Sequence, residues 1–395
     1  MKILMLTPYL PYPLMSGGQT RSFNLIKNLS KKHEIILFSL IKDEKEKENI
    51  PELLKYCKKV SVFNRSKTPW TLRNLLLTGF GPYPFLVIRN LSSEEKEAIK
   101  KELTDSKYDL IHAETFYVMP HIPKTSVPVL LVEQTIEYLV YNHFVEEQAP
   151  KLLRPFLRLD VLKLKYWETH FWKQAKRVVA MTESDRKEKR KLSPGLAIDI
   201  VPNGIDINYF SKKEKNNTPV KKVLYVGNFT WLQNTEAVKI LVNNVWPKIK
   251  KSVLGVKLWI VGTHMKSEIK NLASDDIEVT EGLNDIRDAY KNASVLVAPI
   301  KGPGGTRLKI LEAMASALPV VTTSVGAEGL GVSNNNEALI KDDMDSLAGA
   351  AVSILTNVNL AGRLGRSGKD FVEKNYTWDK SSDKLDKIYK EVYGK

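Results

Sequence analysis

The sequence is poor in cysteine and lacks long apolar runs. Its 395 residues include one cysteine, Cys57, which excludes an intramolecular disulfide and a cysteine-rich zinc site and fits a reducing compartment. No apolar run approaches the roughly 18 residues that cross a bilayer. The apolar opening resembles a signal peptide, but Pro8, Pro11 and Pro13 interrupt it and no small-x-small cleavage pattern follows. We therefore expect a first strand rather than a targeting segment, and a cytoplasmic chain.

Common metal and nucleotide motifs are also missing. The histidines show no metal-ligand spacing, and no H-E-x-x-H segment occurs. The chain also lacks the G-x-G-x-x-G dinucleotide fingerprint and the P-loop. We expect neither a metal nor a resident cofactor.

Positive charge, in contrast, is abundant and uneven. The formal net charge is +15, and residues 151–191 hold 13 Lys and Arg against 5 Asp and Glu, mixed with Leu, Phe and Trp. This mixture suits a helix lying on an anionic membrane, and equally a helix packed on its own domain with its basic residues in solvent. Nucleic acid is an unlikely partner, because no zinc-finger spacing, RNP motif or basic region with heptads is present.

The order of apolar runs predicts an α/β chain with two doubly wound parallel sheets. We expect the first sheet from strands at 2–7, 34–40, 60–63, 108–112, 127–132, 177–180 and 198–201, and the second from strands at 223–226, 256–261, 277–279, 294–298 and 319–322. The polar run 211–220 is the best linker. The predicted parts are an N-terminal domain (1–206), a linker (207–221), a C-terminal domain (222–375) and a last helical segment (376–395).

The segment 302–312 has the parts of an anion site. Its glycines, including Gly304 and Gly305, leave backbone N–H groups free, and we expect Thr306 to begin a helix. Arg307 and Lys309 add positive charge. Glu312 lies about one turn beyond Lys309, where its carboxylate can accept two hydrogen bonds from a ribose diol.

Two further loops follow strands of the first domain, where open α/β sheets bind ligands. Gly17 and Gly18 precede a helix and let the backbone approach a phosphate or a sugar; a flexible turn is the alternative. At the end of the strand near 108–112, we expect His112 or Glu114 to project into a crevice, unless His112 is bonded to the backbone.

The run GGTRLKILEAMASALPVVTTSVGAEGL (304–330) resembles the donor-site motif of GT-B glycosyltransferases of family 4. Four more segments match that family in order: the Gly17-Gly18 loop, residues 109–114, VVAMTESDR followed by VPNGID (178–206), and VLYVGNFTWLQNTEAV (223–238). The resemblance covers essentially the whole chain. It implies the GT-B fold, with two Rossmann-like domains facing across a cleft and a C-terminal helix crossing back to the first, acceptor-side domain.

The resemblance also implies a function and the residues for it. It implies retaining, metal-independent transfer of a sugar from a nucleotide-diphosphate sugar to a glycan or lipid-linked acceptor in cell-surface polysaccharide or glycoconjugate synthesis. By the family pattern, Glu312 would hold the donor ribose, and Arg307 and Lys309 would neutralise the diphosphate as it leaves. The other donor-binding positions are Gly17, Gly18, Asn228, Gly262, Thr263, Leu283, Gly304, Gly305 and Thr306.

The sequence departs from the family pattern at three places. Gly304 stands where the first of two glutamates eight residues apart would fall. Asn228, and roughly Asn234, replace an arginine and a lysine. Glu114 replaces a second histidine, so either His112 or Glu114 would take the catalytic role in the first domain.

Other functions stay open from the sequence. The missing first glutamate is compatible with a sugar-nucleotide-binding protein without catalysis, and the architecture with a sugar-nucleotide epimerase. Charge alone suggests a nucleic-acid-binding protein. The apolar, Gly/Pro-broken segment 68–89, together with 151–191, could bring the first domain to an anionic membrane that carries a lipid-linked acceptor; a helix pair around the acceptor site is the alternative.

Overall fold

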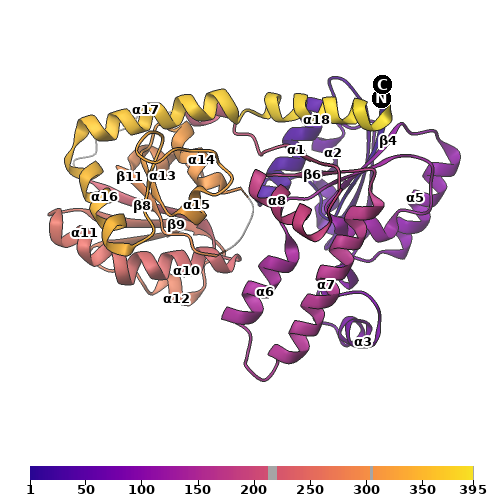
Figure 1. Cartoon of the computed structure of the whole chain (residues 1–395), viewed down its shortest axis with the longest axis horizontal. Helices are drawn as coiled ribbons and strands as arrows, with labels where there is room; N and C mark the ends of the chain where they lie inside the picture. Colours follow the sequence, from indigo (N-terminus) through magenta and orange to yellow (C-terminus); the bar gives the residue numbers. More distant parts are fainter. Residues whose placement is uncertain (212–219, 303–305, 395) are drawn as a thin grey trace. The chain divides into compact units, whose positions relative to one another are not determined.

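The computed structural model describes residues 1–211, 220–302 and 306–394. Its contacts divide the chain into two units, one formed by Met1–Pro202 with Trp378–Lys395 and the other by Asn203–Thr377. Most of the predicted linker lies outside the described residues. Figure 1 shows each unit as a sheet covered by helices.

The first unit is built on a seven-stranded, wholly parallel sheet among the described residues. The strand order is β3-β2-β1-β4-β5-β6-β7. The strands are β1 (Lys2–Thr7), β2 (Glu34–Ile41), β3 (Lys59–Asn64), β4 (Leu110–Glu114), β5 (Val129–Val132), β6 (Arg177–Ala180) and β7 (Ile198–Ile200). Because every strand runs the same way, all the carboxyl ends meet at one edge, where we expect ligands.

Helices cover both faces of this sheet, which explains why its central strands β1, β4 and β5 are buried along almost their whole length. On β1, Ile3 and Met5 face one core with α18, and Leu4 and Leu6 face another with α7. The helices of this unit are α1 (Gly17–Leu29), α2 (Ile50–Leu53), α3 (Leu72–Phe80), α4 (Phe85–Ile88), α5 (Ser93–Asp105), α6 (Glu137–Glu147), α7 (Arg154–Gln174), α8 (Glu183–Leu192) and α18 (Trp378–Tyr393), with 3-10 turns at Glu44–Asn49 and Phe116–His121.

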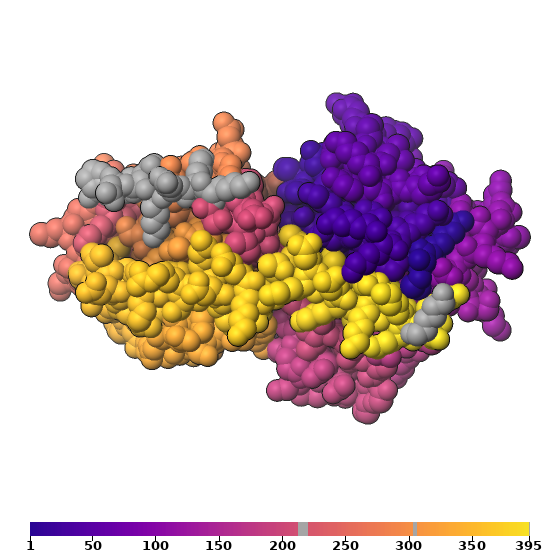
Figure 2. Space-filling view, turned by 90° about the horizontal axis from the view of Figure 1, so that it is seen from above, coloured from indigo at the N-terminus to yellow at the C-terminus, as the bar shows by residue number. Residues whose placement is uncertain are grey.

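The last helix of the chain belongs to the first unit. Trp378, Leu385, Ile388, Tyr389 and Val392 form one buried face of α18 and join the core around β1. Figure 2 shows this segment in yellow against the indigo N-terminal segment.

The second unit has a six-stranded parallel sheet within the described residues, ordered β10-β9-β8-β11-β12-β13. Its strands are β8 (Lys222–Asn228), β9 (Lys257–Thr263), β10 (Ile277–Glu281), β11 (Val295–Ala298), β12 (Val320–Thr322) and β13 (Leu339–Ile340). Its helices are α9 (Ile207–Ser211), α10 (Leu232–Ile240), α11 (Trp246–Ser252), α12 (Ser267–Lys270), α13 (Arg287–Asn292), α14 (Leu308–Ala315), α15 (Ser324–Ala327), α16 (Met344–Thr356) and α17 (Val358–Asn375), with a π-helical turn at Leu241–Val245 between α10 and α11.

Two helix starts and one strand differ from the sequence prediction. By residue type, Asn234 or Thr235 would cap the helix that follows β8, but α10 begins at Leu232 and the Asn234 side chain bonds to Asn228 and Tyr225. Helix α14 begins at Leu308 rather than at Thr306. The two-residue strand β13 was not predicted, because so short an apolar pair has no measurable period.

Candidate active site

The donor-type motif lies at the carboxyl edge of the second sheet, at the start of α14. Arg307 occupies the N-cap position, is 8% exposed, and donates from Nη2 to the carbonyl oxygen of Gly302 at 2.8 Å. A helix N-terminus carries partial positive charge, and Arg307 adds a full charge beside it. Gly304 and Gly305 lie outside the described residues, and the buried Oγ1 of Thr306 has no hydrogen-bond partner among the described residues.

Lys309 lies in the first turn of α14 and is held by neighbouring elements. Its Nζ donates to the hydroxyl of Tyr225 at 2.9 Å and to Oδ1 of Asn234 at 2.5 Å, and it lies 4.2 Å from the centre of the Tyr225 ring. Burial, and then the charge of Arg307, lower the pKa of Lys309 to about 7. At neutral pH the lysine is therefore only partly charged, whereas Arg307 keeps a full charge.

Glu312 follows one turn later. Its Oε2 accepts a hydrogen bond from the Tyr290 hydroxyl at 2.6 Å. Burial raises the pKa of Glu312, while Tyr290 and Lys309 oppose that shift. Among the described residues, Oε1 accepts no hydrogen bond, so this oxygen can still receive a hydroxyl group of a ligand.

The ends of β8 and β9 form the other side of this edge. Asn228 is paired with Thr263 across the two strands, and Asn228 Oδ1 accepts from the backbone N–H of Thr230. A Cβ atom on Gly262 would lie 1.9 Å from the carbonyl oxygen of Gly227, so the strands can approach only with glycine here. Leu283 packs partly buried against the adjoining core.

In the first unit, Gly17 and Gly18 form the first turn of α1, capped by Ser16. A Cβ atom on Gly18 would lie 2.6 Å from the Tyr9 hydroxyl and 2.8 Å from Oε1 of Gln134. The position is therefore glycine because two polar side chains, one following β1 and one following β5, lie against the backbone.

His112 and Glu114 do not project into a crevice; this geometric prediction was wrong. Both side chains are fully buried on β4. His112 hydrogen-bonds to the Tyr389 hydroxyl through Nδ1 and to Glu114 Oε2 through Nε2 at 2.8 Å. The strand end lies beneath α1 and α18, which supply partners for both residues, and this packing explains the burial.

Glu114 is the centre of a buried polar network. Its Oε1 accepts from Gln134 at 2.7 Å and lies 3.8 Å from Nε of Arg21, which is 1% exposed. Burial raises the pKa of Glu114, but the bond from His112, the charges of His112 and Arg21 and the Gln134 bond outweigh it and hold the pKa below its usual value. The carboxylate is therefore ionised, and His112 Nε2 donates a hydrogen bond to it.

Sequence reasoning missed the partners of the predicted residues. Tyr225, Tyr290, Tyr389, Arg21 and Gln134 anchor Lys309, Glu312, His112 and Glu114, yet each lies far from its partner in sequence. Of these partners, only Tyr389 could have been found from the sequence, because it falls on the apolar face of the last helix. A polar atom on such a face needs a buried partner.

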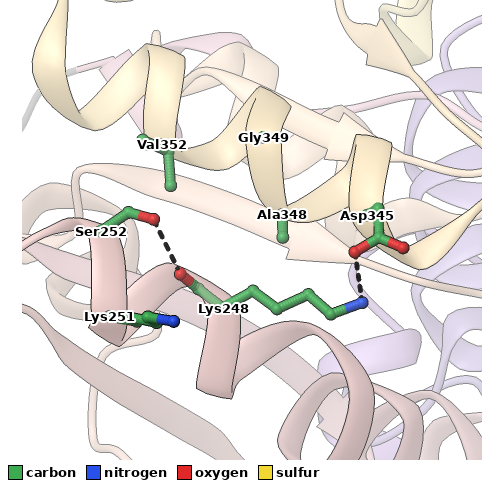
Figure 3. Close-up of a pocket in the computed structure, with 7 residues that line it drawn as sticks. All are labelled: Lys248, Lys251, Ser252, Asp345, Ala348, Gly349 and Val352. Atoms are coloured by element: carbon green, nitrogen blue, oxygen red, sulfur yellow. Dashed lines mark hydrogen bonds and ion pairs between the residues drawn. The ribbon is translucent and has the colours of Figure 1, made fainter.

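A separate hollow lies between α11 and α16. It is lined by Lys248, Lys251, Ser252, Asp345, Ala348, Gly349 and Val352. Figure 3 shows the Lys248 side chain extending across the hollow to Asp345, where Nζ and Oδ1 are 2.5 Å apart. Its lining includes none of the described residues of the donor-type motif, so this hollow differs from the site described above.

Comparison with known proteins identifies both halves. A family described as "Glycosyltransferase Family 4" matches residues 15–209, and one described as "Glycosyl transferases group 1" matches residues 220–357. The chain carries glycosyltransferase domains of group 1 and family 4. It is a glycosyltransferase.

Relatives and solved structures agree with this assignment. An uncharacterized 44.6 kDa protein in the cps region of Klebsiella pneumoniae is 23% identical, over 95% of this chain and 96% of its own. A GDP-mannose-dependent phosphatidylinositol monomannoside mannosyltransferase of Mycobacterium tuberculosis is 24% identical over 49% of this glycosyltransferase and 55% of its own length. Sucrose-phosphate synthase of Thermosynechococcus elongatus has a TM-score of 0.74 at 18% identity, over 99% of each chain, and establishes the GT-B fold.

Proposed function

We propose that this glycosyltransferase transfers a sugar, with retention and without a metal, from a nucleotide-diphosphate sugar to a glycan or lipid-linked acceptor of a cell-surface polysaccharide or glycoconjugate. The observation that carries the proposal is the start of α14, where Arg307, Lys309 and Glu312 share one helix end. The charges suit a diphosphate, and the free oxygen of Glu312 suits a ribose hydroxyl. The location of the Klebsiella relative's gene in a cps region supports the polysaccharide role.

The residues of this edge can supply what the reaction needs. As the glycosidic bond breaks, negative charge grows on the leaving diphosphate, and Arg307 and the N-terminus of α14 stabilise it. Tyr225 and Asn234 fix the position of Lys309 beside them. We propose that the leaving phosphate oxygen takes the proton of the acceptor, which then attacks from the same face. His112 and Glu114 act by positioning Tyr389, Gln134 and Arg21 rather than by touching the sugar.

We expect one nucleoside diphosphate to stabilise the protein against heating. A ligand at 100 times its dissociation constant adds about 2.7 kcal/mol to the free energy of unfolding. The measurement is a thermal-shift screen of UDP, GDP, ADP, CMP and their sugar conjugates without metal. Glu312→Ala should lose the shift because it removes the ribose acceptor, whereas Glu373→Ala, at an exposed position of α17, should keep it. A panel without any shift would contradict the donor site and favour the nucleic-acid-binding alternative.

An anionic membrane is the partner we propose for the first unit. Figure 1 shows α6 and α7 projecting from its sheet with α3 beside them, and Lys163 of α7 binds the carbonyl oxygens of Thr78 and Gly81 at the end of α3. The apolar side chains exposed here are Trp70, Leu72, Leu75, Leu76, Leu77, Phe80, Leu152, Leu153, Phe156, Leu159 and Leu162. Lys151 and Arg73 lie exposed among them. Large exposed apolar patches mark interaction sites, and the cations match anionic lipid.

We expect the protein to sediment with vesicles rich in phosphatidylglycerol and to stay free of phosphatidylcholine vesicles. Phe80 is 91% exposed, so Phe80→Asp should weaken binding at least tenfold without unfolding the chain. Leu254→Asp is the matched control, because Leu254 is 95% exposed in the other unit. Equal binding of both variants, or none by the wild type at low salt, would contradict the membrane role.

Among the described residues, no helix has both the length and the apolar character that a bilayer crossing requires.

A further inference from the structure

Three cationic side chains follow neighbouring elements at the carboxyl edge of the first sheet. Lys42 directly follows β2 and Arg65 directly follows β3, and the last residues of these strands, Ile41 and Asn64, are paired in register. The backbone N–H of Arg65 donates to the carbonyl oxygen of Ile41 at 2.9 Å. The parallel register therefore fixes Lys42 and Arg65 side by side.

A third cation is brought in by the end of α4. Arg89 is the C-cap residue of that helix. The next residue, Asn90, accepts a hydrogen bond from Nη1 of Arg65 through Oδ1 at 2.5 Å, and its own Nδ2 is held by the carbonyl oxygen of Leu86. This bond joins the end of α4 to Arg65, so Arg89 and Arg65 lie in one cluster.

The folded chain compensates the charge of this cluster only in part. Within residues 1–211, 220–302 and 306–394, none of Lys42, Arg65 and Arg89 forms an ion pair, although the neighbouring Lys67 reaches Asp43 at 2.7 Å. One carboxylate, Glu46, faces the cluster and partly offsets the charges of Lys42 and Arg65, and its Oε1 also accepts from the backbone N–H groups of Lys42 and Asp43. The buried Nε of Arg65 has no hydrogen-bond partner among the described residues. Like charges held together in this way destabilise the free protein, and an anion would relieve them.

The electrostatics agree with the geometry. Burial, followed by the charges of Arg65 and Arg89, lowers the pKa of Lys42. Burial, followed by the charge of Arg89, lowers the pKa of Arg65 to about 10. Arg89 also faces the buried carboxyl group of Glu137, but burial raises the pKa of that group and its partner is Tyr117. The cluster thus keeps a net positive charge.

We propose that Lys42, Arg65 and Arg89 bind a phosphate or diphosphate group of the acceptor. The proposal rests on the proposed transferase function and adds the chemical class of the acceptor. Tyr9, which follows β1, and Gly18, in the first turn of α1, lie against each other at this same edge. A planar guanidinium binds two phosphate oxygens at once, while Lys42 supplies a mobile charge.

The test is calorimetric titration of the full chain with inorganic pyrophosphate. Because the donor site also attracts this probe, the background is the Arg307→Gln protein. We expect this background to bind pyrophosphate and the added pair Lys42→Gln/Arg89→Gln to weaken that binding at least tenfold. If the double substitution lowers the melting temperature, Lys42→Gln alone is used in its place, because Lys42 is exposed. The matched control is Lys100→Gln/Lys101→Gln, which removes two exposed charges from α5.

Two outcomes would overturn the acceptor site: no pyrophosphate binding in the Arg307→Gln background, or binding that Lys42→Gln/Arg89→Gln leaves unchanged. A wrong donor assignment is distinguishable from a wrong acceptor site. It would abolish the nucleotide thermal shift but leave pyrophosphate binding unchanged. Titration with decyl diphosphate in neutral micelles distinguishes the two sources of the phosphate group, a lipid-linked acceptor and a phosphorylated soluble acceptor. Binding at least tenfold tighter than pyrophosphate supports a lipid-linked acceptor, and equal binding supports a phosphorylated soluble acceptor.

Discussion

We expect replacement of Arg307 by glutamine to lower the rate of sugar transfer about 10²- to 10³-fold, the loss seen when one preorganised donor to a developing oxyanion is removed. Arg307 is the permanent charge at the start of α14. Lys309 cannot replace it, because burial and Arg307 lower the lysine's pKa to about 7 and its Nζ already bonds to Tyr225 and Asn234. We expect the loss mainly in kcat, since the leaving diphosphate gains charge only in the transition state.

The measurement is steady-state transfer, or hydrolysis of the donor that the thermal-shift screen identifies. Arg307→Lys should recover part of the rate, because it keeps the charge but loses the planar pair of donors. Arg287→Gln removes an arginine that pairs with Asp285 in the same unit, at 2.7 Å, and should leave kcat within a few-fold. An Arg307→Gln enzyme with unchanged kcat would place the leaving group elsewhere.

Much of the fold could be predicted from apolar periodicity. The strands at Lys2–Thr7 and Arg177–Ala180 have the predicted limits, because buried parallel strands are continuous apolar runs between polar ends. The start of α10 was misplaced because Asn234 is a good capping residue by type. Its side chain instead bonds to Tyr225, Asn228 and Lys309, and no local rule reveals such distant partners.

In the second unit, a sequence motif predicted the residues of the candidate site. In the first unit, only their place at the end of a strand did. Arg307, Lys309 and Glu312 are near in sequence, so one helix end brings them together. His112 and Glu114 were identified as a strand-end pair, but their burial depends on α1 and on a helix some 270 residues later in the chain, α18. The apolar periodicity of a helix shows which of its faces is buried, but it does not show which strand that face covers.

Burial of Glu114 has a measurable consequence for stability. Glu114→Gln removes the carboxylate that compensates the buried charge of Arg21, and breaking one partner of a buried ion pair costs about 3–5 kcal/mol. Arg21 remains bonded to the carbonyl oxygens of Val201 and Pro202, which lie far along the chain and cannot neutralise it. We therefore expect the free energy of unfolding of the first unit to fall by about this amount at pH 7, without loss of the nucleotide thermal shift of the second.

The pH dependence separates a charge effect from a packing effect. The pKa of Glu114 is held below its usual value in the folded state, so its contribution is complete above the unfolded value of about 4.3 and is lost as the pH falls through the folded value. The difference between wild type and Glu114→Gln should thus be largest at neutral pH and shrink in acid. Denaturant titration with hydrogen exchange of the β4 amides measures it. Glu44→Gln, which breaks an exposed pair with Lys47, should cost about 0–1 kcal/mol. A Glu114→Gln deficit that is equally small, or independent of pH, would show that the network does not depend on the ionised carboxylate.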